Sequence, residues 1–418
     1  MKILIIGSGA REHALARSLS QDASVTSLHA APGNPGIAQH ASLHACDIAI
    51  PNDIADLAER LNVDLVVIGP EAPLVAGAAD AVRARGIACF GPSTLAARIE
   101  GSKAFAKEIM AAAGVPTGRS RTCHTLGEVG AAMDEFGPPF VVKDDGLAAG
   151  KGVVVTSDRE LALAHAAGCR TVVVEEFLDG PEISLFGISD GERVLAFDPA
   201  QDFKRVGDGD TGGNTGGMGA YSPLPWAPSD LVERVRREIL QPTIDEMRRR
   251  DTPFVGLLYA GLALTSAGLK VIEFNARFGD PETQVLLARL RTPLAGVLYQ
   301  AATGSLDADA KLDFAKDAAV TVVIASAGYP EAVRTGDPIS GLTEASDAGA
   351  VVFHAGTRIQ DGHLLSSGGR VLSVTGFGPN LVAAREVAYR GVNAITLAGS
   401  IHRSDIALEA AEKQLSRG

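Results

Sequence analysis

The sequence predicts an α/β protein that opens with a parallel sheet and closes with a β-rich domain. Short apolar runs such as 2–6 and 65–68 alternate with helical stretches over the first 100 residues, which favours an open parallel sheet. After residue 310, short strands and glycine turns follow one another closely, which indicates a compact β-rich unit. A chain of 418 residues is long for one hydrophobic core, so we expect roughly two to four packed units.

Composition narrows the class of protein. Hydrophobic residues make up 46% and charged residues 21%, which is typical of a folded globular chain. The formal charge of −12 argues against a nucleic-acid partner, because such a partner needs a basic surface. No apolar run approaches membrane-spanning length, so we expect no membrane partner. The four cysteines form no CxxC pair and the N-terminus leads directly into a strand, so we expect a reduced, cytoplasmic protein.

The first predicted strand ends in the turn Gly7-Ser8-Gly9, and a helix is expected over 10–19. A helix N-terminus presents free N–H groups and the positive end of its dipole, so this turn favours a phosphate. It resembles a dinucleotide-binding turn only in part, because Glu12 replaces the third glycine and no acidic residue closes the second strand. We therefore favour a phosphate-bearing small molecule over a nicotinamide cofactor, with a purely structural turn as the alternative.

Two more loops, 32–36 and 69–73, follow predicted parallel strands. Loops at the carboxyl ends of parallel strands share one edge of the sheet, where open α/β folds bind ligands. His40, His44 and Cys46 superficially resemble metal ligands, but they lack a helical spacing and a fourth partner, so we expect no metal there.

A glycine-rich loop at 144–152 lies between two predicted strands. The strand before it ends in Lys143, and backbone N–H groups of such a loop can close over a polyphosphate. No GxxxxGK[ST] run leads into a helix, so it is not a Walker A loop. The next strand, 171–174, leads into acidic residues; its edge would pair with an adenine, and Glu182 would accept ribose hydroxyls.

The segment 201–219 combines high glycine content with Lys, Arg, Asp, Asn and Thr residues. A flexible linker rarely has this mixture, so we expect a mobile loop that orders over substrates. A long helix over 229–250 and a strand over 257–264 are expected to follow.

The stretch 271–282 is where we expect the chemistry. On a strand, Glu273 and Asn275 face one side while Phe274 packs on the other. A carboxylate and an amide oxygen at this spacing suit Mg²⁺, and Arg277 tends to the same side. The alternative is a strand end with a solvated charge cluster.

Together these stretches resemble the ATP-grasp superfamily, and more narrowly the phosphoribosylamine–glycine ligase (glycinamide ribonucleotide synthetase) family of purine synthesis. The matching stretches are 7–13, 32–34, 69–75, 101–105, 145–152, 175–180, 204–223 and 271–282. They run in order along nearly the whole chain, which is more specific than any single motif. Asp144 departs from an expected Ala, and a short 160–171 segment indicates a trimmed lid.

The resemblance implies an α/β substrate-binding domain at 1–100, an ATP-grasp domain at 101–310 with a small lid subdomain at about 116–178, and a β-rich domain at 311–418. It implies that ATP, glycine and 5-phosphoribosylamine give ADP, phosphate and glycinamide ribonucleotide through glycyl phosphate, with Mg²⁺ or Mn²⁺. We expect a monomer, with a weak dimer as the alternative. Two other functions stay open: an ATP-grasp ligase for another acid and amine, and a nucleotide-binding dehydrogenase.

The resemblance also implies residue roles. The expected catalytic residues are Arg277, Lys204 and Asp202, and the expected metal ligands are Glu273 and Asn275. The expected ATP contacts are Lys103, Lys143, Gly150, Lys151, Gly152, Glu175, Glu176, Phe177, Leu178 and Glu182. The expected substrate contacts are Gly9, Arg11, Glu12, Asn34, Gly69, Glu71, Asp210, Asn214, Thr215, Gly216, Arg277, Gly279 and Asp280. In the C-terminal domain we expect no catalytic constellation, and His354 and His363 are expected to be structural or surface residues.

Overall fold

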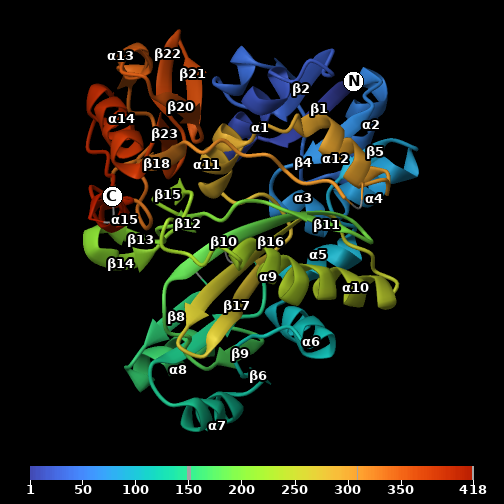
Figure 1. Ribbon diagram of the computed structural model, residues 1–418, viewed down its shortest axis with the longest axis vertical. Coiled ribbons are helices and arrows are strands. Elements are labelled where there is room, and N and C mark those ends of the chain that lie inside the picture. Colours follow the sequence, from blue (N-terminus) through green and yellow to red (C-terminus); the bar gives the residue numbers. More distant parts are fainter. Residues whose placement is uncertain (148–151, 308, 417–418) are drawn as a thin grey trace.

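A computed structural model describes residues 1–147, 152–307 and 309–416. The N-terminal and C-terminal parts lie side by side, and the central part of the chain lies beneath both (Figure 1). Within the described ranges, no helix is both long and apolar enough to cross a bilayer.

The N-terminal part is the expected open parallel sheet. Its strand order is β3-β2-β1-β4-β5, and every neighbouring pair is parallel. The strands are β1 (Lys2–Gly7), β2 (Ser27–Pro32), β3 (Ser42–Leu43), β4 (Leu65–Ile68) and β5 (Ala88–Phe90); the helices are α1 (Ala10–Ser20), α2 (Pro51–Leu61), α3 (Glu71–Ala76) and α4 (Ala78–Ala84). Ile3 and Ile5 pack with α1 on one face, while Leu4 and Ile6 pack with α2 and α4 on the other.

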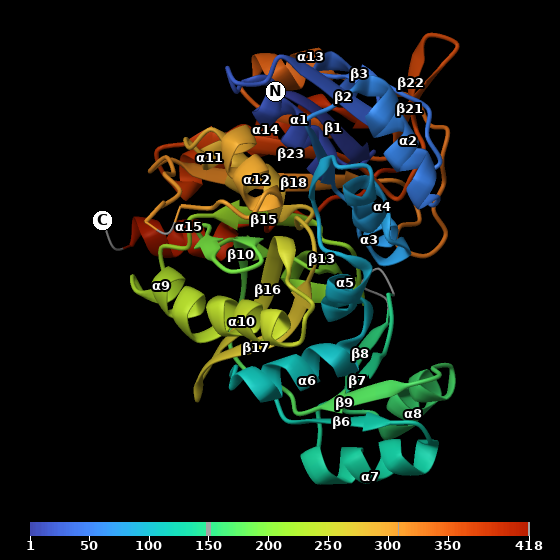
Figure 2. The same cartoon turned by 90° about the vertical axis from the view of Figure 1, so that its right-hand side faces the viewer.

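The central part begins with two helices and a small antiparallel sheet of order β6-β9-β7-β8. The helices are α5 (Thr94–Gly101) and α6 (Lys103–Ala113), and the sheet comprises β6 (Ser120–Cys123), β7 (Phe140–Asp144), β8 (Val153–Thr156) and β9 (Val172–Glu175). Helices α7 (Leu126–Phe136) and α8 (Arg159–Ala167) bury its apolar face through Met133 and Ala162. We call this unit the lid sheet; it projects at the bottom of both views (Figures 1 and 2).

A second antiparallel sheet, the main sheet, faces the lid sheet. Its order is β11-β10-β16-β17, with β10 (Glu182–Asp190), β11 (Val194–Ala196), β16 (Val255–Thr265) and β17 (Gly268–Asn275). The long helix expected over 229–250 consists of α9 (Leu231–Val235), a π-helical turn (Arg236–Leu240) and α10 (Gln241–Arg249). Pro242 has no N–H to donate to the preceding turn, which accounts for the interruption of the α-helical pattern there.

The C-terminal sheet has the order β12-β15-β18-β23-β20. It comprises β12 (Gln201–Asp202), β15 (Gly219–Ser222), β18 (Ala318–Ala325), β23 (Arg370–Gly378) and β20 (Val351–His354), and α14 (Leu381–Ala394) covers it. The remaining elements are η1 (Ile37–Gln39), η2 (Asp208–Asp210), β13 (Arg205–Gly207), β14 (Thr211–Asn214), α11 (Glu282–Arg289), α12 (Leu294–Ala302), β19 (Ile339–Ser340), α13 (Leu342–Asp347), β21 (Thr357–Gln360), β22 (His363–Ser366), β24 (Thr396–Leu397) and α15 (Leu408–Leu415).

The glycine-rich segment 201–219 is more regular than the expected loop. Its ends, β12 and β15, pair with each other and join the C-terminal sheet, and a short β13–β14 hairpin lies between them. The glycines allow this hairpin because Gly212 adopts a positive φ of 79°. The C-terminal sheet therefore fixes both ends of the segment.

Buried histidines join the N-terminal and C-terminal parts. The His354 N–H donates to His13 Nδ1 at 2.8 Å, and Asn34 Nδ2 donates to the carbonyls of His354 and Ser8, each at 2.8 Å. Burial, with the neighbouring charges of His354, His40 and Arg17, lowers the pKa of His13 to about 2, and burial lowers the pKa of His354 to about 4. His354 thus has the structural role expected for it, and His363 lies on the surface.

We predict that acid weakens this joint. Below an unfolded-state pKa of about 6.5, unfolded histidines bind protons that the folded ones exclude, so stability falls with falling pH by up to ~1.4 kcal/mol per pH unit for each histidine. His13→Asn keeps an acceptor near Nδ1 but does not titrate. Its thermal midpoint should change less between pH 7.5 and 5.5 than that of the wild type, whereas surface His363→Asn should match the wild type. An unchanged pH dependence in His13→Asn would refute the assignment.

Candidate active site

The expected metal ligands occupy the end of β17. A bulge places Gly261 opposite Glu273 and Leu262 opposite Val271, and Phe274 is buried. Glu273 and Asn275 therefore share the opposite, partly exposed face. Among the described residues, neither side chain has a hydrogen bond or an ion pair within the protein. Their oxygens are available to a ligand.

The donor chemistry fits a hard divalent cation. No group of three or more His, Cys, Asp or Glu side chains in the described part of the chain could hold a metal alone. Mg²⁺ typically binds one or two protein oxygens and takes its other ligands from phosphates and water. One carboxylate and one amide oxygen on β17 match that mode.

Lysines from α6 and the lid sheet meet a buried glutamate beside β17. Lys143 Nζ lies 3.0 Å from Glu175 Oε1 and donates to the Ile272 carbonyl at 3.1 Å. Lys107 Nζ lies 2.8 Å from Glu175 Oε2. The Glu175 side chain is thus engaged by two lysines, so only its backbone can contribute to the adenine edge expected there. Lys107 was not predicted.

Lys103 supports the loop that follows β7. Its Nζ donates to the carbonyls of Asp144 at 2.8 Å and Gly146 at 2.9 Å. Burial lowers the pKa of Lys103, and the nearby charge of Glu273 opposes that shift. Gly152 accepts from the Asp144 N–H at 2.8 Å. The predicted ATP contacts Gly150 and Lys151 lie outside the described residues.

The strand end after β9 has its own ion pairs. Glu176 pairs with Arg119 at 2.8 Å and Lys270 at 2.9 Å, which ties the lid sheet to β17. Phe177 is 49% exposed, and Leu178 adjoins it in the chain. An exposed ring at this position is available to pack against a flat ligand.

Lys204 lies between two carboxylates at the start of the glycine-rich segment. Its Nζ pairs with Glu182 and lies 3.8 Å from Asp202 Oδ2. Burial alone would lower the pKa of Lys204, but the charges of Asp202, Glu182 and Glu273 raise it well above its usual value. Lys204 is therefore a permanent cation close to the Glu273 face.

Arg277 connects the N-terminal sheet to β17. Its guanidinium lies 3.1 Å from Glu71, at the start of α3, and 3.1 Å from Glu100, at the end of α5. Glu100 also accepts from the Ala276 N–H at 2.7 Å. Both carboxylates that Arg277 meets belong to the protein, and Glu100 was not predicted.

The carboxylate of Glu12, a residue of α1 itself, lies at the N-terminus of this helix. Glu12 accepts from the Gly9 N–H at 2.6 Å and from Arg11 Nε at 2.5 Å, and Arg11 also donates to the Phe278 carbonyl at 3.0 Å. A Cβ on Gly69 would lie 2.0 Å from Glu12 Oε1, so only glycine fits there. The expectation that the Gly9 N–H receives a ligand phosphate needs correction, because the Glu12 carboxylate occupies it.

The C-terminal sheet contributes side chains that we did not predict. Arg370 on β23 donates to the carbonyls of Gly216 and Asp280, the latter at 2.7 Å, and lies 3.3 Å from Asp280 Oδ2. Burial alone would raise the pKa of Asp280, but the charges of Arg370 and Arg11 lower it overall. The Gly216 N–H donates to the Tyr329 hydroxyl at 3.1 Å. The C-terminal domain therefore contacts the predicted site residues Gly216 and Asp280, and the expectation that it holds no catalytic constellation stays a prediction.

Three other predicted residues of the glycine-rich segment each have a different partner. Asn214 Nδ2 donates to the Val153 carbonyl of the lid sheet at 3.4 Å, and the Thr215 N–H donates to the Lys204 carbonyl at 2.8 Å. Asp210 instead pairs with Arg403 at 2.6 Å, so it is part of the contact with the C-terminal domain.

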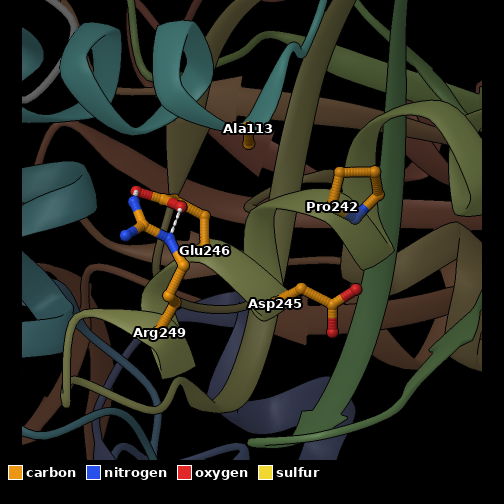
Figure 3. A pocket seen from close by; sticks show the side chains of 5 residues that line it. All are labelled: Ala113, Pro242, Asp245, Glu246 and Arg249. Atoms are coloured by element: carbon orange, nitrogen blue, oxygen red, sulfur yellow. Dashed lines mark hydrogen bonds and ion pairs between the residues drawn. The ribbon is translucent and has the colours of Figure 1, made fainter.

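A surface depression of about 300 Å³ lies elsewhere, between α10 and the end of α6. Figure 3 shows Arg249 paired with Glu246 at its side, an interaction of 2.7 Å. Ala113, Pro242, Asp245, Glu246 and Arg249 line it, and none is a predicted site residue.

Two antiparallel sheets that meet through Lys143 and β17, preceded by an open parallel sheet, define an ATP-grasp protein. Residues 1–100, 101–283 and 319–409 match the N domain, the ATP-grasp (A) domain and the C domain of phosphoribosylglycinamide synthetase, respectively. The chain belongs to the phosphoribosylglycinamide synthetase family.

Full-length relatives support this membership. The chain is 65% identical over 414 residues to a phosphoribosylamine–glycine ligase of Streptomyces coelicolor, covering 98% of this chain and 100% of that protein. It is 55% identical over 425 residues to the corresponding ligase of Mycobacterium leprae, covering 99% and 100%. A crystal structure of the Thermotoga maritima ligase superposes with a TM-score of 0.85 at 30% identity, covering 97% of this chain and 100% of that one.

More distant structures share the fold alone. The biotin carboxylase domain of a Hydrogenobacter thermophilus carboxylase, bound to MgADP, has a TM-score of 0.71 at 15% identity and covers 96% of this chain and 91% of that one. The family resemblance and the α/β architecture read from the sequence are therefore confirmed.

Proposed function

We propose that this chain is an ATP-dependent carbon–nitrogen ligase that joins glycine to 5-phosphoribosylamine and forms glycinamide ribonucleotide, ADP and phosphate. The observation that carries the proposal is the 65% identity to the Streptomyces coelicolor phosphoribosylamine–glycine ligase along that protein's whole length. This reaction is a step of de novo purine synthesis.

The first half-reaction activates glycine. A glycine carboxylate oxygen attacks the γ-phosphorus of ATP, ADP leaves, and glycyl phosphate forms. Negative charge opposes this attack, so cations must surround the phosphates. Lys103, Lys143 and Lys204 supply fixed positive charge around the face of β17. A divalent cation, Mg²⁺ or Mn²⁺, held by Glu273 and Asn275, would add charge neutralisation at the phosphates.

The second half-reaction forms the amide. The amine nitrogen of phosphoribosylamine attacks the glycyl carbonyl carbon, and phosphate leaves with the bonding electron pair. Glycyl phosphate hydrolyses in water, so the site must exclude solvent during this step. The loop at 145–152, of which residues 148–151 lie outside the described part of the chain, and the segment 202–217 are the covers that we assign to it. Asn214, which already contacts the lid sheet, supports that assignment.

We place ATP between the lid sheet and the main sheet, with the adenine at 175–178 and the ribose near Glu182. We place phosphoribosylamine at the carboxyl edge of the N-terminal sheet, near Asn34, Gly69 and Glu71. The Arg277 to Glu71 ion pair supports this placement, because it joins that edge to β17. We place Gly279 and Asp280 between the ATP site and the phosphoribosylamine site.

Arg11 tests the placement of phosphoribosylamine, because its guanidinium is a cation at that edge. Arg11→Met should raise the apparent KM for phosphoribosylamine by about tenfold and leave those for ATP and glycine near wild type, since a lost charged hydrogen bond is worth about 1.5–3 kcal/mol. Exposed Arg60→Met on α2 serves as the control. An equal rise in all three KM values would show that Arg11 only holds Glu12 and the fold.

The same proposal includes three domains at 1–100, 101–310 with a lid at about 116–178, and 311–418, which the family matches support. It also includes a monomer working in the cytoplasm on small-molecule substrates.

A coupled assay of ADP release tests the function. Release should require ATP, glycine and phosphoribosylamine together. ADP release with another acid and amine would indicate a different ligase, and hydride transfer to a nicotinamide would indicate the dehydrogenase.

A further inference from the structure

Four buried side chains form an unbroken series of polar contacts from the Lys204 cluster to α11. Ser184 Oγ donates to Asp202 Oδ1 at 3.2 Å, the Ser184 and Tyr259 hydroxyls are 2.9 Å apart, and Tyr259 lies 2.6 Å from Glu282 Oε1. Ser184 Oγ also lies 3.3 Å from that oxygen. Each of the four side chains is less than a tenth exposed, so water does not compete for these bonds. We call these residues the carboxylate chain.

The carboxylate chain is one proton short when both carboxylates are ionised. Tyr259 then donates to Glu282, and Ser184 donates to Asp202. The two hydroxyl oxygens, 2.9 Å apart, have no proton left between them. One additional proton on Asp202 completes the series, because Asp202 then donates to Ser184, Ser184 to Tyr259, and Tyr259 to Glu282. The geometry therefore has a place for one proton between two carboxylates.

Asp202 is the end of the chain that faces the site. Its Oδ2 lies 3.8 Å from Lys204 Nζ, within the cluster that includes Glu182. Burial raises the pKa of Asp202 to about 7; Lys204 opposes the rise, and the charges of Glu282 and Glu182 add to it. Burial and the charge of Glu282 raise the pKa of Tyr259 well above its usual value, so its hydroxyl stays protonated. A base serves best when its pKa is near the working pH.

We propose that Asp202 is the base of the amide-forming step, and that Ser184, Tyr259 and Glu282 position it and share its proton. This inference rests on the proposed function. As the amine nitrogen bonds to the glycyl carbon, the carbon–oxygen bond to phosphate breaks and the proton on nitrogen passes to Asp202. Hydrogen bonds along the carboxylate chain then stabilise the protonated state until products leave and the proton returns to solvent.

The test separates the two half-reactions in the full-length enzyme. Amide formation is measured with phosphoribosylamine, and glycyl phosphate is measured by trapping with hydroxylamine as glycine hydroxamate. Asp202→Asn should lower amide formation by about 10²–10⁴-fold, and Tyr259→Phe by about tenfold. Both variants should form hydroxamate within about twofold of wild type, because that readout reports the first half-reaction. Tyr389→Phe, which loses two hydrogen bonds on α14, is the matched control.

The pH dependence of amide formation in Glu282→Gln distinguishes a shared proton from a purely structural role, because a structural role would leave this pH dependence unchanged. Glutamine keeps an acceptor for Tyr259 but removes the charge that raises the pKa of Asp202, so the acidic limb of the amide-formation rate should shift to lower pH. The other charges that face the chain, Lys204, Glu182 and Arg277, are unchanged in this variant. An unmoved limb would overturn the shared-proton assignment.

Other outcomes separate this inference from the function on which it rests. If wild type forms amide and Asp202→Asn does so equally well, the assignment of the base is wrong and the ligase function stands. A parallel loss of both readouts in Tyr259→Phe would show that the chain only maintains the fold. If wild type forms neither amide nor hydroxamate, the proposed function fails and this inference fails with it.

Discussion

Glu273→Gln is expected to lower ATP turnover by at least about a hundredfold while the protein stays folded. Glutamine has nearly the same shape but lacks the negative charge that a divalent cation needs from its protein ligand. Glu273 has no protein partner among the described residues, so the substitution breaks no internal ion pair and folding should survive. Steady-state ADP release at saturating substrates measures the effect, and the thermal midpoint checks the fold.

The control is Glu409→Gln, at an exposed position on α15 that is remote in sequence and fold. Turnover in this variant should match the wild type. Near-normal turnover of Glu273→Gln at ordinary Mg²⁺ concentrations would contradict the placement of the metal on β17. Partial recovery of the variant at high Mn²⁺ would agree with a weakened cation site.

Arg277→Met is expected to lower the free energy of unfolding by about 3–5 kcal/mol. The Arg277 side chain is 18% exposed and Glu100 only 7%, so removing the guanidinium leaves a buried carboxylate without its cation. Glu71 loses its partner as well. Urea unfolding followed by fluorescence measures the change, and the N-terminal sheet should detach from β17 first.

A combined variant distinguishes charge from packing. Adding Glu100→Gln and Glu71→Gln to Arg277→Met removes the two carboxylates that have lost their cation in the single variant. The amide oxygen introduced by Glu100→Gln can still accept from the Ala276 N–H. The combined variant should recover much of the lost stability. If it is no more stable than Arg277→Met alone, the loss comes from packing, and the ion-pair account of this joint is wrong.

The sequence was sufficient for features that depend on local pattern. Period-two alternation at Glu273, Phe274 and Asn275 predicted the two faces of β17 correctly, because successive side chains of a strand point to opposite faces. The positions of the loops after predicted parallel strands also predicted that these loops share one edge of the N-terminal sheet. The family resemblance then supplied the two facing sheets of the central domain, which no local pattern contains.

What the sequence did not predict depends on contacts between distant segments. Glu100 and Arg370 lie far along the chain from Arg277 and Asp280, and nothing in their neighbourhoods marks them. Tyr259 on β16 and Glu282 at the start of α11 are 23 residues apart in the sequence and meet only in the folded chain. Lys107 had a usable signal, since it lies four residues after Lys103 on the same helix. Glu12 shows the opposite error, because a free helix N-terminus was expected where the side chain supplies its own anion.

Transfer of oxygen from glycine to phosphate tests the central claim most directly. The acyl-phosphate route joins a glycine carboxylate oxygen to the γ-phosphorus, and that oxygen stays with phosphate when the amide forms. With glycine labelled by ¹⁸O at both carboxylate oxygens, each phosphate released should carry one ¹⁸O atom, and the product amide should retain the other. Phosphate free of label, with amide formed at the normal rate, would contradict activation of glycine at this site.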